Sequence, residues 1–221
     1  MILAVTAGKG GVGKSTVALN LAAELEAVVV DADLAMADLP ATRGPDLHDV
    51  LAGRAAPVEA VREGGPVAVL PCGRSLSGAR TVEPTALTDA LDAVARAHGR
   101  VVVDSPAGLH GDAGLPVFAA GACLLVTCPT EAALTDAIRA RELARAVGTP
   151  LARVVLNRVR DDADTGAVAA ALGGPVTEIP ESEALARAQR AGRPVATLAP
   201  DAPARRQFER LAAAVHSAVS S

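Results

Sequence analysis

A glycine-rich loop between a short apolar run and a helical pattern constrains the fold of this chain more than any other feature. Gly8 to Ser15 fits the spacing G-x-x-x-x-G-K-[ST], and the apolar run Ile2-Leu3-Ala4-Val5-Thr6 before it predicts a strand. After the loop, apolar residues recur with helical spacing at Val17, Ala18, Leu21, Ala22 and Leu25. A strand, a loop and a helix in this order place unpaired helical N–H groups and a positive dipole end at the loop. The segment is therefore predicted to bind phosphate.

The loop residues divide the expected phosphate contacts among themselves. Glycines let the backbone wrap the phosphates, the Lys14 ammonium is placed to reach the β- and γ-phosphates, and the Ser15 hydroxyl to coordinate Mg²⁺. The predicted nucleotide contacts are Gly8, Lys9, Gly10, Gly11, Val12, Gly13, Lys14, Ser15 and Thr16. Lys9 and Lys14 are the only lysines, and the other nineteen of the 21 Lys and Arg residues are arginines. We expect both lysines to touch phosphate, because a compact ammonium enters a cradle that a planar guanidinium does not fit.

Lys9 gives the loop the form K-G-G-x-G-K-[ST], and in this form the chain resembles the deviant-Walker-A P-loop ATPases of the MinD/ParA family, closest to the MinD-like members. Three further markers carry the resemblance, and with the loop they cover residues 1 to about 195. They are Val30-Asp31-Ala32-Asp33 as a first switch, residues 103–109 (V-D-S-P-A-G-L) as the MinD form of Walker B, and Asn157 with Ile179-Pro180-Glu181 as adenine-binding segments. The resemblance implies ATP and Mg²⁺ as ligands and an ATP-dependent homodimer.

Aspartates at two strand ends are the expected acidic groups of the site. In a doubly wound sheet, ligands bind outside the carboxyl ends of the strands, where Asp31, Asp33 and Asp104 are expected to lie. By resemblance, Asp33 would position or activate the attacking water and Asp104 would bind Mg²⁺ through a water, while Asp31 would support them. Phosphoryl transfer requires little else from the protein than metal, positive charge and an oriented nucleophile. Each strand-end aspartate can instead be only a cap or turn residue, and that alternative stays open.

The implied catalytic residues are Lys9, Lys14 and Asp33, and the implied metal ligands are Ser15, Asp33 and Asp104. Lys9 stands at the start of the loop. By resemblance it would point away from its own γ-phosphate and reach the partner's nucleotide across a face-to-face dimer. Asp38 stands where MinD proteins usually carry Asn, so the first switch departs from the family pattern there.

Residues 157–160 bear on the choice of base. GTP-binding proteins read guanine with N-K-x-D, whose aspartate accepts hydrogen bonds from the N1–H and N2 amino groups. Here the sequence is N-R-V-R, which puts a cation at the aspartate position and favours ATP over GTP. By resemblance, the base would be framed by Asn157, Arg158, Pro180, Glu181 and Ser182. Asn157 can also be only a strand-end cap.

Alternating apolar runs and helical periods predict an α/β fold, a doubly wound, mostly parallel sheet with helices on both faces, as in P-loop NTPases. With 221 residues, 50% of them hydrophobic, the chain can bury one sizeable core and is short for two domains, so residues 1–221 are expected to form a single P-loop ATPase domain. The predicted strands are Ile2–Thr6, Ala27–Asp31, Val67–Leu70, Arg100–Asp104, Cys123–Thr127, Arg153–Asn157 and Val176–Ile179. The predicted helices are Lys14–Glu26, Leu47–Ala52, Pro84–His98, Glu131–Val147, Ala163–Leu172, Ser182–Ala191 and Ala204–Ala218.

Apolar runs, cysteines and charge limit the location of the protein and its partners. No run of about 18 or more apolar residues is present, and the N-terminus enters a strand without a charged leader, so we expect a cytoplasmic protein. Cys72, Cys123 and Cys128 are odd in number and lack C-x-x-C spacing, so buried free thiols are expected. The net charge of -4 argues against broad affinity for nucleic acid.

The C-terminal helix bears on membrane and DNA binding. An apolar stripe runs from Phe208 to Val215 with helical spacing, which is typical of a helix docked on the sheet. The chain stops at Val219-Ser220-Ser221 without the further basic amphipathic tail of MinD proteins, so no autonomous membrane anchor is expected. Three arginines outside the stripe leave weak non-specific DNA binding open, namely Arg205, Arg206 and Arg210.

Three functions are compatible with these features. The favoured one is a MinD/ParA-like ATPase whose slow, partner-stimulated hydrolysis drives a dimerisation switch for the spatial organisation or partitioning of a cellular cargo, with an unknown activator or cargo protein. A P-loop ATP-dependent ligase or amidase is the second, although the loops of such enzymes typically lack the first lysine. A nucleotide-binding regulatory module without turnover is the third. Dimerisation by ATP alone would favour the switch, and phosphate release stimulated by a substrate would favour the ligase.

Overall fold

The strands form one parallel sheet. The computed structural model describes residues 1–33, 43–73, 84–108, 111–160 and 163–219. Within them, seven strands pair in parallel in the order β3-β2-β4-β1-β5-β6-β7. Their bounds are β1 Ile2–Thr6, β2 Val28–Asp31, β3 Val69–Leu70, β4 Val101–Asp104, β5 Ala122–Thr127, β6 Leu151–Val159 and β7 Val176–Pro180. The first strand lies in the middle and later strands are added on both sides of it, which confirms the predicted α/β, doubly wound class.

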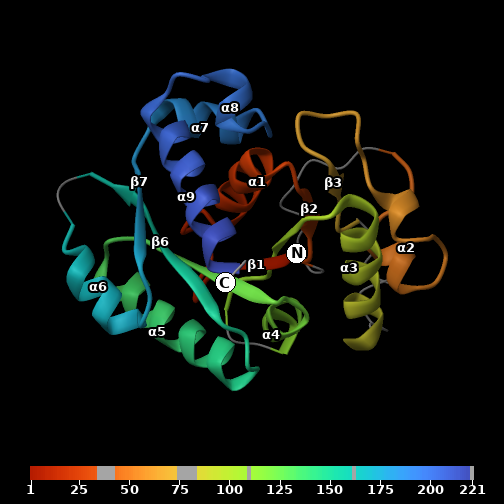
Figure 1. Cartoon of the computed structure of the whole chain (residues 1–221), viewed down its shortest axis with the longest axis horizontal. Coiled ribbons are helices and arrows are strands. Elements are labelled where there is room, and N and C mark those ends of the chain that lie inside the picture. Colours follow the sequence, from red (N-terminus) through yellow and green to blue (C-terminus); the bar gives the residue numbers. More distant parts are fainter. Residues whose placement is uncertain (34–42, 74–83, 109–110, 161–162, 220–221) are drawn as a thin grey trace.

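Helices cover both faces of the sheet, as Figure 1 shows. Helices α1, α8 and α9 lie on one face, and α3, α4, α5 and α6 lie on the other. Alternate side chains of a strand point to opposite faces, so β4 places Val102 in the core beneath α1 and Val103 in the core beneath α3. The helices are α1 Lys14–Leu25, α2 Leu47–Leu51, α3 Pro84–His98, α4 Gly111–Ala119, α5 Glu131–Ala146, α6 Thr165–Leu172, α7 Glu183–Arg190, α8 Val195–Leu198 and α9 Pro203–Val219, with the 3-10 helix η1 at Val58–Ala60.

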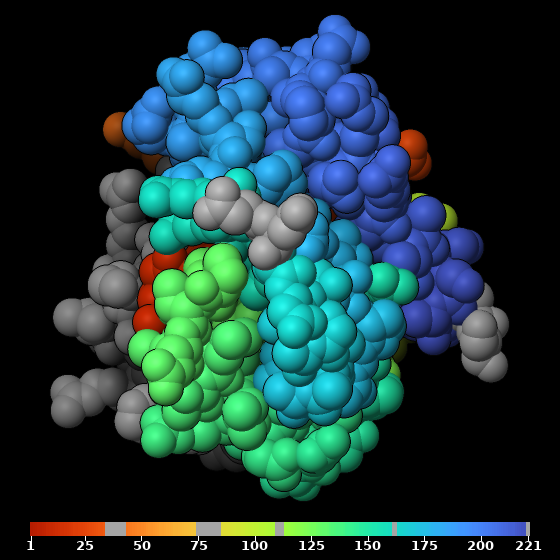
Figure 2. Space-filling view, turned by 90° about the vertical axis from the view of Figure 1, so that its left-hand side faces the viewer, coloured from red at the N-terminus to blue at the C-terminus, as the bar shows by residue number. Residues whose placement is uncertain are grey.

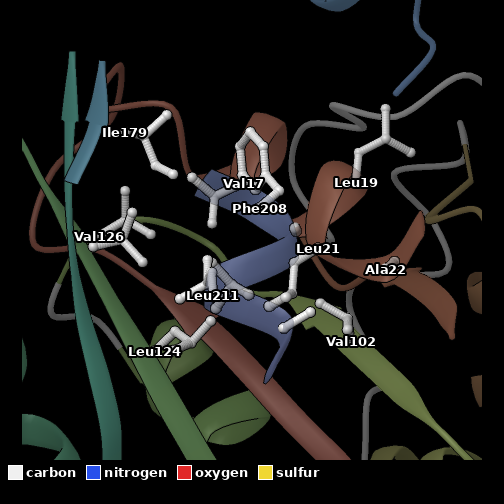
Figure 3. Close-up of a cluster of buried hydrophobic side chains, with 14 of the residues drawn as sticks. Val17, Leu19, Leu21, Ala22, Val102, Leu124, Val126, Ile179, Phe208 and Leu211 are labelled. Atoms are coloured by element: carbon white, nitrogen blue, oxygen red, sulfur yellow. The ribbon is translucent and has the colours of Figure 1, made fainter. Parts of the chain in front are cut away.

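Helix α9 docks on the sheet through the predicted apolar stripe. Phe208, Leu211 and Val215 have no exposed surface, and they pack in one cluster with Val17 and Leu21 of α1 (Figure 3). Full burial of side chains of this size stabilises a fold by about 1.5–3 kcal/mol each. The helix is therefore held by its apolar face, as the sequence predicted.

Every predicted strand and helix is present, with ends shifted by no more than two residues, but α4, α8 and η1 were not predicted. Helix α4 contains Gly114 and Pro116, which disfavour a helix interior. Two side chains of α4 itself, Ala113 and Val117, are buried, and the Thr149 hydroxyl donates a hydrogen bond to the Val117 carbonyl (2.7 Å). These contacts offset the weak helical propensity. Within the part of the chain that the structure describes, none of the helices combines the length and apolar character needed to cross a membrane.

Candidate functional site

The glycine loop joins β1 to α1 and is pressed against two other elements. Gly11 and Gly13 adopt left-handed backbone conformations, with φ of 81° and 95°, which glycine adopts without strain. A Cβ on Gly13 would lie 2.2 Å from Asn157 Nδ2, and a Cβ on Gly8 would lie 1.9 Å from the Asp136 carbonyl oxygen. The glycines thus let the loop approach β6 and α5. Figure 2 shows red atoms of this N-terminal segment at the surface beside green atoms of the β5–α5 region.

The loop ends in a helix N-terminus that no side chain caps. Gly13 is the N-cap of α1 and supplies no side-chain acceptor, and the first turn of α1 carries no acidic residue. The positive end of the helix dipole is therefore not offset within the helix, which favours an anion at the loop. The loop geometry fits the predicted phosphate cradle.

Lys14 lies inside this cradle against the end of β4. Its ammonium Nζ is 2.5 Å from Asp104 Oδ1, and both side chains are buried, with 7% and 0% of their surface exposed. Asp104 stands opposite Asp31 in the parallel β2–β4 register, so two strand ends bring carboxylates to the same edge of the sheet. The expected convergence of Asp104 on the loop is present. The sequence does not predict the direct Lys14–Asp104 ion pair, because the two residues are 90 positions apart.

Asp33 and Asp31 form a turn directly after β2. The Asp33 N–H donates to Asp31 Oδ1 at 3.2 Å, so Asp31 supports the backbone on which Asp33 is carried. Hydroxyl and carboxylate oxygens from Ser15, Asp33 and Asp104 are the hard donors that Mg²⁺ prefers. Among the described residues, no three His, Cys, Asp or Glu side chains come together as a metal site. Mg²⁺ that accompanies a nucleotide usually keeps several waters and binds phosphate oxygens with few protein ligands, and Ser15, Asp33 and Asp104 would supply those ligands directly or through water.

Asn157 faces the loop from β6. Its Nδ2 donates to the Val12 carbonyl at 2.8 Å, which fixes the amide, and its buried Oδ1 has no hydrogen-bond partner. A buried carbonyl oxygen without a donor is costly, so this atom fits a ligand that supplies an N–H group. The following residue, Arg158, has a left-handed φ of 59° and lies at the register shift between Asn157 and Val159 in the β6–β7 pairing.

Glu181 and Ser182, which are also implied in base binding, have hydrogen-bond or ion-pair partners within the protein. Glu181 forms an ion pair with Arg160, and the Arg160 guanidinium lowers the pKa of the Glu181 carboxyl. The Glu181 N–H donates to the Val159 carbonyl at 2.8 Å, so that backbone group is already used. Ser182 caps α7 by accepting from the Leu185 N–H at 3.4 Å. The two Glu181 contacts join the end of β6 to the turn that follows Pro180, the last residue of β7.

The family of this chain follows from comparison with known proteins. Residues 3–195 match the CobQ/CobB/MinD/ParA nucleotide binding domain. The chain belongs to this family. An uncharacterized ATP-binding protein of Methanocaldococcus jannaschii is 33% identical over 230 residues, which cover 97% of this chain and 88% of the relative.

Two solved MinD structures resemble this member of the MinD/ParA family over nearly its whole length. The cell division ATPase MinD of Pyrococcus furiosus has a TM-score of 0.88 and 29% identity, and 98% of each chain is covered. The septum site-determining protein MinD of Pyrococcus horikoshii, complexed with Mg-ADP, has a TM-score of 0.86 and 27% identity over 96% of this chain and 93% of that one. The expected resemblance to MinD/ParA proteins is confirmed.

Lys9, the marker of the MinD/ParA loop, lies in a different environment from Lys14. Lys9 is half-buried, and it has no ion-pair partner among the described residues. Together with Arg158 it flanks Cys128, whose Sγ lies 3.6 Å from the Val12 carbonyl. Burial raises the pKa of the Cys128 thiol, and the two cations oppose that rise. The outer end of the loop is therefore electropositive.

A buried thiol–imidazole pair beside Asp33 was not predicted from the sequence. Cys72 Sγ lies 3.0 Å from the Asp33 carbonyl oxygen and 3.7 Å from His48 Nε2. Burial, followed by the charges of three aspartates (Asp31, Asp33 and Asp46), raises the pKa of Cys72 to about 12. Cys72 and Cys123 are buried free thiols, as expected, while Cys128 is half-buried.

Two residues of the expected family markers lie outside the described residues. They are Asp38, where the first switch departs from the MinD pattern, and Leu109 of the Walker B segment.

Proposed function

We propose that this protein is a Mg²⁺-dependent ATPase in which ATP binding and slow hydrolysis drive reversible dimerisation, for the positioning or partitioning of a cellular cargo. The observation that carries the proposal is the contrast between the two loop lysines. Lys14 is buried against Asp104 at the strand ends, whereas Lys9 is half-buried at the outer end of the loop without a carboxylate partner among the described residues. This contrast supports a role for Lys14 at the chain's own nucleotide and for Lys9 at a partner's.

ATP binding would exchange the partner of Lys14. A triphosphate at the N-terminus of α1 offers Lys14 a stronger set of charged acceptors than Asp104 alone, so the ion pair opens and the ammonium contacts the β- and γ-phosphates. Asp104 then becomes available to the metal together with Ser15 and Asp33. These oxygens, or waters bound to them, would hold Mg²⁺, which would supply positive charge toward the phosphate oxygens.

Asp33 would orient the attacking water, since it follows β2 at the same sheet edge as Asp104. Phosphoryl transfer depends mainly on alignment of the nucleophile and on charge stabilisation. The Asp31 contact to the Asp33 N–H restricts the backbone there, and this supports a positioned carboxylate. Turnover is expected to stay slow until a second chain, an activator or a cargo protein completes the site.

The adenine ring would lie beside Asn157. The buried Oδ1 of Asn157 accepts hydrogen bonds only, so it suits the exocyclic amino group of adenine and opposes the carbonyl oxygen that guanine carries at the same position. Arg160, which stands where GTP-binding proteins have their aspartate, is paired with Glu181. Both features support ATP as the nucleotide.

Weak non-specific binding of DNA by the dimer stays a prediction. Arg205, one of three arginines considered for weak DNA binding, is paired with Glu24 at 3.3 Å and with Glu209 at 3.0 Å. These carboxylates reduce the positive charge that a phosphate backbone would meet, so Arg206 and Arg210 would have to carry most of such an interaction.

The experiment that tests the proposal is the association state of the chain with a non-hydrolysable ATP analogue and Mg²⁺, measured by light scattering at tens of micromolar. We expect the wild-type protein to dimerise with the analogue and to be monomeric with ADP. Lys9→Ala should bind the analogue with an affinity within about three-fold of wild type and stay monomeric, because only the contact across the dimer is lost. Lys9→Arg should also fail, since a planar fork does not replace a compact ammonium.

Arg210→Ala is the matched control, because it removes one exposed positive charge from α9 and leaves the loop intact. It should dimerise like the wild type. A wild-type chain that stays monomeric with the analogue, or a Lys9→Ala chain that dimerises normally, rejects the switch. Stimulation of phosphate release by a small-molecule substrate in a monomeric chain would instead support the ligase alternative.

A further inference from the structure

Two backbone hydrogen bonds bring α2 and the end of β3 together next to Asp33. The Leu47 N–H donates to the Pro71 carbonyl at 2.9 Å, and the His48 N–H donates to the Cys72 carbonyl at 3.2 Å. His48 and Cys72, separated by 24 positions in the sequence, therefore lie side by side. Their side chains are buried, with only 2% and 1% of each residue exposed.

The start of α2 is itself held in place. Asp46 caps the helix through the Asp49 N–H at 3.0 Å, and Asp49 returns a contact to the Asp46 N–H at 3.3 Å. Gly73 adopts a left-handed φ of 109°, and a Cβ there would lie 2.6 Å from the Asp46 carboxyl group. The chain after β3 therefore passes close over the cap, and this fixes where Cys72 can stand.

Cys72 joins this support to the main chain of Asp33. Its Sγ lies 3.0 Å from the Asp33 carbonyl oxygen, and the only hydrogen-bonding role of a thiol toward a carbonyl is to donate. His48 Nε2, at 3.7 Å from the same sulfur, can donate in turn when that nitrogen carries the ring proton. The geometry gives a short relay from the His48 imidazole to the Cys72 thiol and on to the Asp33 carbonyl.

We infer that Cys72, supported by His48, is a positioning residue that holds the Asp33 backbone so that the Asp33 carboxylate can align the attacking water. The inference rests on the proposed ATPase function. In this role Cys72 would act through the Asp33 backbone and not on the nucleotide. A free cysteine is mostly in the thiol form at neutral pH, because its ordinary pKa is about 8.5, so Cys72 can donate to the Asp33 carbonyl.

A contact of this kind should affect the chemical step and leave ground-state binding unchanged. Small displacements of a group that aligns a nucleophile cost rate far more than affinity. In the proposed function the nucleotide would be held by the loop and the N-terminus of α1, which Cys72 does not contact in the hydrogen bonds described above. A change in turnover at constant ATP affinity is therefore the signature that separates positioning from general support of the fold.

The test compares steady-state hydrolysis by the full chain with Mg-ATP in wild type and Cys72→Ala. We expect kcat to fall about ten-fold while KM stays within about two-fold. Affinity for ADP with aluminium fluoride, which mimics the transferring phosphoryl group, should fall by a similar factor. Affinity for a non-hydrolysable ATP analogue should not change. Cys72→Ser keeps a donor at the same place and should retain at least a third of the wild-type kcat.

Cys123→Ala is the matched control, since it also removes a buried thiol but at the start of β5, where Cys123 pairs with Ala4 and Leu151. Its kcat should stay within two-fold of wild type. The inference is overturned if Cys72→Ala has a kcat within two-fold of wild type, or if Cys72→Ser is as slow as Cys72→Ala. Equal weakening of both analogues would overturn it as well. Should Cys72→Ala not fold, Cys72→Ser together with His48→Leu carries the comparison, with the loss expected in His48→Leu only.

Asp33→Ala separates this inference from the proposed function. Wild-type turnover in Asp33→Ala would remove Asp33 from catalysis, and both proposals on Asp33 would fall. Loss of turnover in Asp33→Ala together with wild-type kcat in Cys72→Ala would overturn the positioning role and leave the ATPase proposal standing.

Discussion

Replacing Asp104 by Asn removes one partner of a buried ion pair and leaves the Lys14 ammonium without a counter-charge. The two side chains have 7% and 0% of their surface exposed, and Nζ and Oδ1 are 2.5 Å apart, so water does not take over the lost contact. Breaking a buried pair in this way costs about 3–5 kcal/mol, a large part of the total stability of a domain. Urea unfolding without nucleotide should show this loss in Asp104→Asn, and an equivalent loss in Lys14→Met.

The double variant Lys14→Met/Asp104→Leu tests the reasoning behind that magnitude. It removes both charges and fills their volume, and such replacements are often neutral. We therefore expect it to be more stable than either single variant. Glu142→Gln is the control, because Arg145 and Glu142 are also 2.5 Å apart but are exposed by 54% and 60%. That change should cost less than about 1 kcal/mol. Asp104→Asn with a loss as small as the control, or a double variant less stable than both single variants, refutes the argument.

The same variants report on the exchange of partners at Lys14. A nucleotide that binds only the folded chain stabilises it by about 2.7 kcal/mol at a concentration of 100 Kd. Wild type should show this shift with Mg²⁺ and a non-hydrolysable ATP analogue at that concentration. Lys14→Met should show almost no stabilisation by the analogue, because it lacks the ammonium that would leave Asp104 and contact the phosphates.

Two further predictions concern buried asparagines. ATP should bind at least ten-fold more tightly than GTP, a difference of about 1.4 kcal/mol, and Asn157→Leu should narrow this ratio; equal competition by both nucleotides against a fluorescent ATP analogue would contradict the role of Asn157 Oδ1. Asn20 accepts from the Val195 N–H at 2.7 Å and donates to the Thr16 carbonyl at 2.8 Å, so Asn20→Ala should lower the free energy of unfolding by about 1–3 kcal/mol. A loss below about 0.5 kcal/mol in urea unfolding would show that water replaces the bond to α8.

The sequence was most informative where local pattern and tertiary contact agree. The loop, its flanking strand and α1 are contiguous, and the apolar period of α9 matches the stripe that packs on α1. Helix α4 was missed because Gly114 and Pro116 weaken its local signal, while the burial that stabilises it comes from other elements. Local propensity carries no information about such contacts.

The contacts of Asp104 and Asp33 could not be predicted from the sequence for a different reason. Lys14 and Asp104 are 90 positions apart, and Cys72 and Asp33 are 39 apart, so only the strand order brings them together. Convergence of strand ends could be predicted, because parallel strands share one carboxyl edge. Which side chains would pair at that edge could not, since pairing depends on the register between β2 and β4 and on the path of the chain after β3.

The proposed dimerisation switch requires a large difference in association free energy between the ATP-bound and ADP-bound states. Moving an association equilibrium from 1:99 to 99:1 requires a difference of about 5.5 kcal/mol between nucleotide states. Hydrogen bonds to charged groups contribute about 1.5–3 kcal/mol each, and a two-fold dimer contains each Lys9 contact twice. Two such contacts supply about 3–6 kcal/mol, which reaches the required range only if both subunits carry ATP. A dimer with one ATP and one ADP would keep a single contact and fall well below the required difference, so in the proposed switch hydrolysis in either subunit would suffice to release the pair.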